Sequence, residues 1–200
     1  MIKNIILDFG DIFFDLDKTA TARAMRSFGL TRLTPELDLL FKTYEKGQVA
    51  TTTFLAEVST YFPKATHPDL IHAWNSILLD FPLYRLEFIE ALAQEKTHRL
   101  FMLSNTNALH INEVRKKMGT KNYLRFKRVF EAFYLSHEIG MRKPDRAIFE
   151  FVLQQNDLVA TETLFVDDTS ENTHAAAKLG IKTWNLAVGQ EDIIQLKSHL

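Results

Sequence analysis

Three short apolar runs in this chain each end at a residue with an oxygen-bearing side chain. The runs and their end residues are 2–7 with Asp8, 98–103 with Ser104, and 163–166 with Asp167. Runs of this length that are rich in leucine and β-branched side chains, and that stop at turn-forming residues, are typical of buried strands. Ligands bind beyond the carboxyl ends of the strands in an open parallel sheet. We therefore expect the three ends to form one site.

From Leu83 onward, helix and strand patterns alternate, which predicts a doubly wound, Rossmann-like α/β fold with a parallel sheet. We expect helices at 84–92, from about 108, from 143–145 and at 173–178, and strands at 132–135 and 181–184. Pro144 suits the first position of its helix, and Gly180 suits a left-handed cap. The last eleven residues are expected to form one amphipathic helix.

Residues 18–82 break this alternation because they contain only helical patterns. Helix starts are indicated around Thr34, Thr51 and His67. We therefore expect a small α-helical domain at 18–82, inserted into an α/β core domain made of 1–17 and 83–200. Candidate substrate-selecting residues in the insertion are Arg23, Lys42, Tyr44, Lys46, Gln48 and Thr51.

The composition favours a cytoplasmic protein. The chain has 200 residues, no cysteine and a formal net charge of −1. Absence of cysteine fits a reducing compartment, and no apolar run suits a signal peptide or a membrane span. The balanced charge argues against nucleic acid or membrane as a partner. We expect a monomer or a weak homodimer that acts on a small molecule.

The residue types at the predicted strand ends suit phosphoryl transfer. An aspartate such as Asp8 can attack phosphorus and form an aspartyl-phosphate, which splits hydrolysis into two steps. A nucleophile and a phosphoryl group that are both negative repel each other, so the site must neutralise charge. Asp8, Asp167 and Asp168 could hold a hard divalent cation through oxygen, and Mg²⁺ is the natural choice.

Three further segments could bind the phosphoryl group of a substrate. Lys143 would add a positive point charge. The hydroxyl of Ser104 and the backbone N–H groups of Asn105 and Thr106 could donate hydrogen bonds to the non-bridging oxygens. Taken singly, each segment is better explained as a plain turn, a helix cap or an exposed residue. Their joint occurrence, in this order on a βα scaffold, favours the functional interpretation.

Four segments in this order resemble the motifs of the haloacid dehalogenase superfamily: Asp8-Phe9-Gly10, Leu103-Ser104-Asn105-Thr106-Asn107, Arg142-Lys143-Pro144-Asp145 and Leu164-Phe165-Val166-Asp167-Asp168. The inserted helical segment resembles the small α-helical cap of that superfamily, and Glu171-Asn172 before an alanine-rich helix is typical of it. The resemblance extends over almost the whole chain and is to the sugar-phosphate phosphatase and β-phosphoglucomutase-like members.

This resemblance implies a Mg²⁺-dependent phosphatase that acts on a small phosphorylated metabolite, for example a sugar phosphate. Asp8 would be the nucleophile and a metal ligand, and Ser104 and Lys143 would orient and neutralise the phosphoryl group. Asp168 with Asp167, and the main-chain carbonyl of Gly10, would complete the metal site.

One position departs from the pattern. Phosphatases of this superfamily usually carry a second aspartate two residues after the nucleophile, as general acid and base, and this chain has Gly10 there. General acid–base catalysis typically increases the reaction rate by about 10²- to 10⁴-fold, so its loss should lower the rate most for substrates with poor leaving groups. Asp11 lies one residue further on. Its offset turns the side chain to the other face of an extended segment, so it is an imperfect substitute.

Two alternatives to a phosphatase stay open. Hydrolytic dehalogenation of a 2-haloacid also uses an aspartate nucleophile without the second aspartate. The pair Asp167-Asp168 argues against it, because adjacent carboxylates repel a carboxylate substrate when no cation is present. The other alternative is a catalytically weak protein that binds a phosphorylated metabolite or a protein partner and acts as a regulator, which Gly10 favours. A phosphomutase would depend more heavily on the missing acid–base residue.

Overall fold

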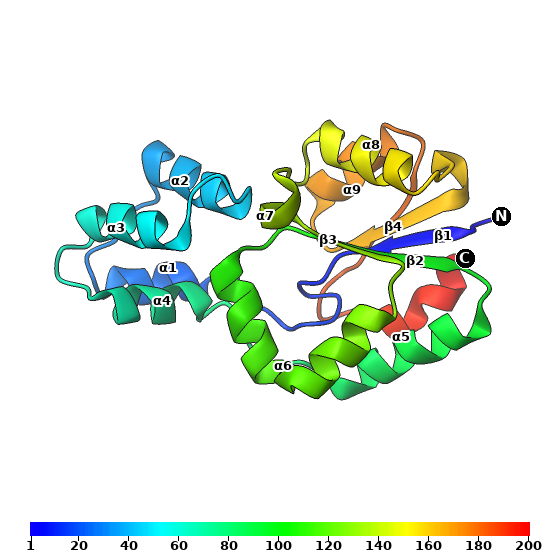
Figure 1. Ribbon diagram of the computed structural model, residues 1–200, viewed down its shortest axis with the longest axis horizontal. Helices are drawn as coiled ribbons and strands as arrows, with labels where there is room; N and C mark the ends of the chain where they lie inside the picture. The colour runs from blue at the N-terminus through cyan, green and yellow to red at the C-terminus, as the bar shows by residue number, and fades with distance from the viewer.

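The computed structural model describes residues 1–200 and contains a five-stranded parallel sheet between two layers of helices (Figure 1). The strands are β1 (Asn4–Leu7), β2 (Arg99–Ser104), β3 (Ala132–Leu135), β4 (Thr163–Asp167) and β5 (Lys182–Asn185). Their order across the sheet is β3-β2-β1-β4-β5, and every neighbouring pair is parallel. The predicted doubly wound, Rossmann-like α/β fold is confirmed.

The register of the sheet brings the predicted strand ends to one edge. Leu7 of β1 lies opposite Met102 of β2 and Val166 of β4. One residue further along, Asp8 therefore lies beside Asp167, and Ser104 ends β2 at the same edge. Carboxylate and hydroxyl groups from segments more than 60 residues apart are thus neighbours because parallel strands end together.

Alternating residues of the strands pack against different helices. Ile5 and Leu7 belong to an apolar cluster with α5 (Leu83–Glu95), α6 (Ala108–Arg128) and the 3₁₀ helix η2 (Ile193–His199). Ile6 belongs to a second cluster with α8 (Arg146–Gln155) and α9 (Ser170–Ala177), on the other face of the sheet. Both faces are therefore buried, as a parallel sheet requires. The short helices α7 (Ser136–Ile139) and η1 (Ala160–Glu162) lie in connections between larger elements. None of the helices combines the length and the apolar composition that a membrane span needs.

Two predicted helices differ from the structure. The helix expected at 143–145 begins at Arg146, with Asp145 as its N-cap residue. The reason is that the backbone of Lys143 is bonded on both sides to the side chain of Asn105, which keeps it out of a helix. The last eleven residues do not form one α-helix, because η2 is a 3₁₀ helix. Its buried residues, Ile193 and Leu196, are three apart, which matches three residues per turn.

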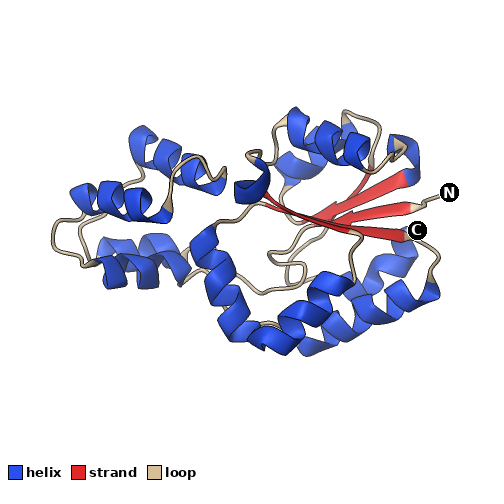
Figure 2. Ribbon diagram, in the orientation of Figure 1, coloured by secondary structure: helices blue, strands red, loops and turns tan.

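Residues 20–75 form four helices that stand to one side of the sheet (Figure 2). They are α1 (Ala20–Arg26), α2 (Pro35–Glu45), α3 (Thr51–Tyr61) and α4 (His67–Asn75). The starts of α2, α3 and α4 agree with the predicted ones, and the side chains of Thr34 and Thr66 cap α2 and α4. An apolar cluster that includes stacked Tyr44 and Phe54 fills the space between these helices, and Leu109 of α6 also belongs to it. We refer to them as the four-helix module.

The chain enters and leaves the module through two antiparallel segments. The amide of Asp15 donates to the carbonyl of Asp80 at 2.8 Å, and the amide of Asp17 donates to the carbonyl of Ile77 at 2.9 Å. Arg85 of α5 forms an ion pair with Asp15 at 2.7 Å. These bonds hold the base of the four-helix module against the sheet.

A polar network joins α4 of the module to the start of α6. The side chain of Asn107, the N-cap residue of α6, accepts hydrogen bonds from the indole of Trp74 at 3.2 Å and from the amide of His110 at 3.0 Å. The ring of His110 bonds to Asn107 through Nδ1 at 3.1 Å and to the carbonyl of Trp74 through Nε2 at 3.1 Å. Desolvation lowers the pKa of His110 to about 4. The neutral ring therefore ties the module to the segment that follows Ser104.

This network predicts a loss of stability in acid. His110 has a pKa of about 4 in the folded protein and its ordinary pKa of 6.5 in the unfolded chain. As the pH falls from 6.5 to 4, the unfolded chain therefore binds a proton at this residue that the folded protein does not bind. The free energy of unfolding should therefore fall by about 2 kcal/mol from this residue between pH 7 and pH 4.5. Urea unfolding at both pH values measures it.

The matched comparison is His110→Gln, with His72→Gln on the exposed face of α4 as control. His110→Gln should be less stable than the unmodified protein at pH 7, and the difference should shrink by about 2 kcal/mol at pH 4.5. His72→Gln should keep the acid dependence of the unmodified protein. An unchanged difference between His110→Gln and the unmodified protein at both pH values would contradict a neutral, buried His110.

Candidate active site

A cavity of about 690 Å³ opens at the carboxyl edge of the sheet, beneath the four-helix module. From the sheet side it is lined by Asp8, Gly10, Asn105, Lys143 and Asp168, and from the module by residues that include Lys42, Lys46 and Gln48. Leu16 and Leu39 are its only leucines, and most of the other lining side chains are polar or charged. The cavity therefore suits a small polar ligand.

Lys143 is the positive centre of this cavity. Its ammonium nitrogen lies 2.8 Å from Oδ1 of Asp8 and 2.6 Å from Oδ2 of Asp167, and its side chain is 1% exposed. The nitrogen also lies 5.4 Å from the ring centre of Phe165. Burial alone would lower the pKa of this group, but the carboxylates of Asp167 and Asp8 outweigh it and raise the pKa. Lys143 therefore carries a permanent charge between two carboxylates.

The three carboxylates of Asp8, Asp167 and Asp168 outnumber the two ammonium groups that contact them, those of Lys143 and Lys18. Burial raises the pKa of Asp8 to about 7, against the effect of Lys143, and the charge of Asp167 raises it further. Burial also raises the pKa of Asp168, although Lys18 opposes this shift. Both shifts express the cost of holding negative charge in a place with little water. A bound cation would relieve that cost.

The donor set fits a hard divalent cation. Oxygen atoms of Asp8, Asp167 and Asp168 lie within 4.8 Å of one another. Asp8 and Asp168 line the cavity together with Gly10, whose carbonyl is a further hard oxygen. All these donors are oxygens and the group contains no sulfur or imidazole, which is the ligand chemistry that Mg²⁺ prefers.

Asp167 differs from the other two because protein donors already surround it. Its side chain is fully buried, and it accepts hydrogen bonds from the amide of Thr169 at 2.8 Å and from the side chain of Asn172 at 3.0 and 3.1 Å. Together with Lys143, these donors occupy both oxygens. Asn172 was not a predicted site residue, although its place in the first turn after Asp167-Asp168 is a usable signal for it.

Asn105 holds Lys143 in position. Its side-chain oxygen accepts from the amide of Lys143 at 2.8 Å, and its side-chain nitrogen donates to the carbonyl of Lys143 at 2.8 Å. The side-chain amide thus pairs with both backbone groups of one residue, as a neighbouring strand would. The segment that follows β2 therefore sets where the ammonium group stands.

Ser104 and Thr106 are buried and do not line the cavity. The hydroxyl of Ser104 has no hydrogen-bond partner within the protein, whereas the amide of Thr106 donates to the hydroxyl of Ser136 at 2.8 Å. A contact between the Thr106 amide and a phosphoryl group would need this bond to break. The backbone amide of Asn105 has no partner in the protein, so it is available to a ligand.

The four-helix module closes over the cavity through contacts at the end of α2. Glu45 pairs with Arg142 at 3.1 Å, and Lys46 pairs with Asp145 at 3.0 Å. Gly47 packs against α7 so closely that a Cβ atom there would lie 2.0 Å from the carbonyl oxygen of His137. These contacts seat the module against the motif that contains Lys143.

Of the candidate selecting residues, Lys42, Lys46 and Gln48 line the cavity. The other three lie elsewhere. Arg23 pairs with Asp17 at 2.7 Å, and the hydroxyl groups of Tyr44 and Thr51 bond to each other at 2.9 Å inside the module. Sequence reasoning could not separate the two groups because all six are polar residues in helical patterns.

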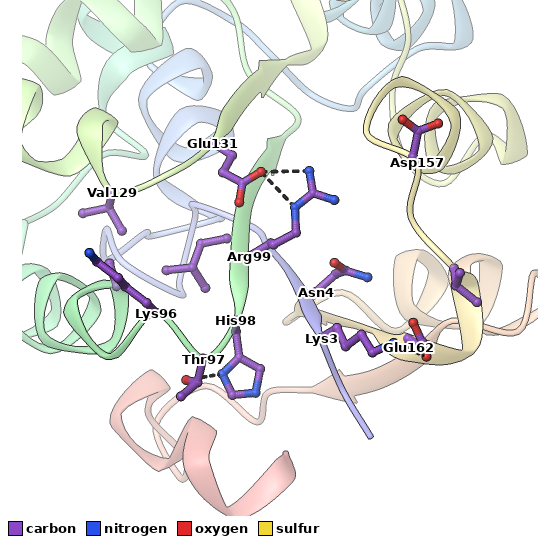
Figure 3. Close-up of a pocket in the computed structure, with 13 residues that line it drawn as sticks. Lys3, Asn4, Lys96, Thr97, His98, Arg99, Val129, Glu131, Asp157 and Glu162 are labelled. Carbon is purple, nitrogen blue, oxygen red and sulfur yellow. Dashed lines mark hydrogen bonds and ion pairs between the residues drawn. The ribbon is translucent and has the colours of Figure 1, made fainter.

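A second hollow lies at the opposite edge of the sheet, where the strands begin (Figure 3). It measures about 590 Å³, and its charged residues are largely paired with one another: Lys3 with Glu162 at 2.8 Å and Arg99 with Glu131 at 2.8 Å. It contains none of the predicted site residues. The predicted site therefore lies at the carboxyl edge and not in this hollow.

Comparison with known proteins agrees with this arrangement. Residues 12–186 match the model of the family described as haloacid dehalogenase-like hydrolase. The chain is 28% identical over 190 residues to a D-ribitol-5-phosphate phosphatase from Bacteroides thetaiotaomicron, with 92% of this chain and 91% of the relative covered.

Two solved structures are similar over nearly the whole chain. One is a haloacid dehalogenase family enzyme from Bacteroides thetaiotaomicron in complex with magnesium and inorganic phosphate. It has a TM-score of 0.80 and 29% identity, and the match covers 96% of this chain and 97% of that one. The other is a predicted hydrolase of the same family from Porphyromonas gingivalis, with a TM-score of 0.83, 27% identity and coverage of 100% and 98%. The chain therefore belongs to the haloacid dehalogenase-like hydrolase family.

Proposed function

We propose that this protein is a Mg²⁺-dependent phosphatase of small polar phosphate monoesters, such as sugar or sugar-alcohol phosphates, and that Asp8 is its nucleophile. The observation that carries the proposal is the buried cluster in which Lys143 lies between Asp8 and Asp167, beneath a polar cavity. The related phosphatase of D-ribitol 5-phosphate and the related enzyme with magnesium and phosphate support it.

The proposed reaction has two steps, formation of an aspartyl-phosphate on Asp8 and its hydrolysis. A carboxylate oxygen of Asp8 attacks the phosphoryl group, and the bond between phosphorus and the ester oxygen breaks with its electron pair going to that oxygen. The released alkoxide takes a proton from water and leaves as an alcohol. The hydroxide formed from that water attacks phosphorus in the aspartyl-phosphate, which frees the Asp8 carboxylate and inorganic phosphate.

Positive charge and donors around Asp8 would stabilise the charge on the phosphoryl oxygens. Lys143 supplies a buried ammonium group, and the free backbone amide of Asn105 supplies a hydrogen-bond donor. The hydroxyl of Ser104, which is buried beside Asn105 outside the cavity lining, would be a further donor once a ligand reaches it. Asp8, Asp168 and the carbonyl of Gly10 would hold the Mg²⁺ ion, with Asp167 beside them. The ion would neutralise the excess of carboxylate charge and polarise the phosphoryl group.

The polar lining favours this chemistry over hydrolysis of a 2-haloacid. A 2-haloacid brings one carboxylate and a carbon–halogen bond, and it would meet Asp8 and Asp168 in the same cavity. Lysines of the module, Lys42 and Lys46, already have carboxylate partners at 2.6 and 3.0 Å. A substrate with several hydroxyl groups can use these paired groups as donors and acceptors without separating them.

Release of inorganic phosphate tests the proposal. The substrates are acetyl phosphate, sugar 1-phosphates, sugar 6-phosphates and ribitol 5-phosphate, each with Mg²⁺ or with excess chelator. We expect release that depends on Mg²⁺ and that is at least ten times faster with Mg²⁺ than with chelator, because the carboxylate charge is otherwise unbalanced. If no member of the panel is hydrolysed while inorganic phosphate still binds in calorimetry, the protein is a binding or regulatory member of the family.

A further inference from the structure

The cavity lacks a carboxylate at position 10, and a leucine takes the space above it. A Cβ atom on Gly10 would lie 2.7 Å from Cδ1 of Leu16 and 3.6 Å from its Cγ. Gly10 and Leu16 both line the cavity with Asp8. At this point beside the nucleophile, neither Gly10 nor Leu16 offers a side chain that could donate a proton or a hydrogen bond to the leaving group.

Asp11 does not take over this position. It is 7% exposed and does not line the cavity. Its Oδ1 accepts a hydrogen bond from the amide of Leu16 at 3.0 Å, and its Oδ2 lies 3.1 Å from the ammonium group of Lys18. Both oxygens therefore have partners within the loop. Asp11 stabilises the loop and holds Lys18.

Lys18 is the charged group that reaches the cavity beside Gly10 and Leu16. Its side chain is 53% exposed, and its ammonium group contacts Asp168 as well as Asp11. An ammonium group has three N–H donors, and these two carboxylates account for two of them. The third N–H donor is therefore open to a ligand in the cavity.

The place of Lys18 in the fold suits contact with the leaving group. In an in-line displacement the leaving oxygen departs on the side of phosphorus opposite the nucleophile. Asp8 lies in the floor of the cavity at the end of β1, so the leaving oxygen faces the four-helix module. Lys18 lies just before α1, the first helix of that module, at the border between the two parts.

We propose that the ammonium group of Lys18 donates a hydrogen bond to the leaving-group oxygen and so replaces the carboxyl group that Gly10 lacks. The proposal rests on the phosphatase function. Lys18 keeps its proton throughout: the bond from Asp8 to phosphorus forms, the ester bond breaks with its electron pair going to the leaving oxygen, and water protonates that oxygen. The lysine stabilises the developing charge electrostatically, which a fixed cation does without reorganisation.

The test is the dependence of kcat/KM on the leaving group. p-Nitrophenyl phosphate, phenyl phosphate and ribitol 5-phosphate are compared in the unmodified protein, Lys18→Met and Lys18→Arg, with Lys64→Met on an exposed loop as control. Lys18→Met should lose about 10- to 100-fold on ribitol 5-phosphate, the effect of one charge-assisted hydrogen bond, and less than about 3-fold on p-nitrophenyl phosphate. Lys18→Arg should recover most of the loss, and Lys64→Met should match the unmodified protein.

Magnesium binding, measured by calorimetry without substrate, distinguishes two roles of Lys18. One is contact with the leaving group, and the other is support of Mg²⁺ binding at Asp168. Loss of Lys18 removes a positive group from Asp168, so the affinity of Lys18→Met for Mg²⁺ should be equal or higher. An equal loss of activity on all three substrates, or weaker Mg²⁺ binding, would overturn the proposal. Absence of phosphate release by the unmodified protein from every substrate is a different outcome, and it would overturn the proposed function and this inference together.

Discussion

Asp8→Asn is expected to lower kcat/KM for phosphate release by at least about 10⁴-fold, as loss of a covalent nucleophile does in other enzymes. The asparagine amide has the shape of the carboxylate but does not attack phosphorus. Asp8 lies at the end of β1, with its carboxylate 2.8 Å from Lys143. The measurement is release of inorganic phosphate from the best substrate of the panel in the presence of Mg²⁺. Asp80→Asn, an exposed carboxylate near the base of the four-helix module, is the matched control and should keep its activity.

The fold of Asp8→Asn should remain intact. Burial raises the pKa of Asp8 to about 7, so the ionised carboxylate is costly in the protein without a cation. An uncharged side chain removes that cost, and Lys143 keeps its bond to Asp167 at 2.6 Å. We therefore expect the Tm of Asp8→Asn, measured with chelator at pH 8, to be no lower than that of the unmodified protein.

Trapping of the intermediate gives an independent check of the nucleophile. Acid quenching of the unmodified protein during turnover of a ³²P-labelled substrate should leave label on the chain, and Asp8→Asn should carry none. More than about 1% of the original activity in a folded Asp8→Asn protein would mean that another group attacks phosphorus, and the assignment of Asp8 would have to be abandoned.

The sheet and its polar edge could be predicted from the sequence because the signals are local. Each buried strand is a short apolar run that ends at a turn-forming polar residue, and parallel strands end at the same edge. This reasoning places Asp8, Ser104 and Asp167 close together without any knowledge of packing. It also predicts a helical segment at 18–82, because helix starts are indicated around Thr34, Thr51 and His67.

Contacts between distant side chains could not be predicted in this way. The amide of Asn105 pairs with the backbone of a residue 38 positions away and thereby moves the start of α8 to Arg146. Lys18 meets Asp168 across 150 positions, and no periodicity or spacing marks that pair. Both depend on how the elements pack, whereas helix propensity at Pro144 acts locally and is overridden here.

Lys143→Met should be the most destabilising single change in the site. The ammonium group is 1% exposed and lies between the carboxylates of Asp8 and Asp167 at 2.8 and 2.6 Å. Removal of one partner from a buried ionic cluster leaves uncompensated charge and typically costs about 3–5 kcal/mol. Urea unfolding at pH 7.5 in chelator should show a loss of that size, and phosphate release should be abolished because the phosphoryl charge is no longer neutralised.

The surface pair of Lys197 and Glu95 provides the matched control, since the side chains are 57% and 41% exposed. Lys197→Met should change the free energy of unfolding by less than about 1 kcal/mol, as exposed pairs do. Combining Lys143→Met with Asp8→Asn should restore part of the stability, because one of the two carboxylates that lose the ammonium group is gone and the neighbouring changes are not additive. If Lys143→Met unfolds at the same urea concentration as Lys197→Met, the buried carboxylates are protonated or solvated in the folded protein. The charge balance that supports a divalent cation at Asp8 and Asp168 would then be wrong.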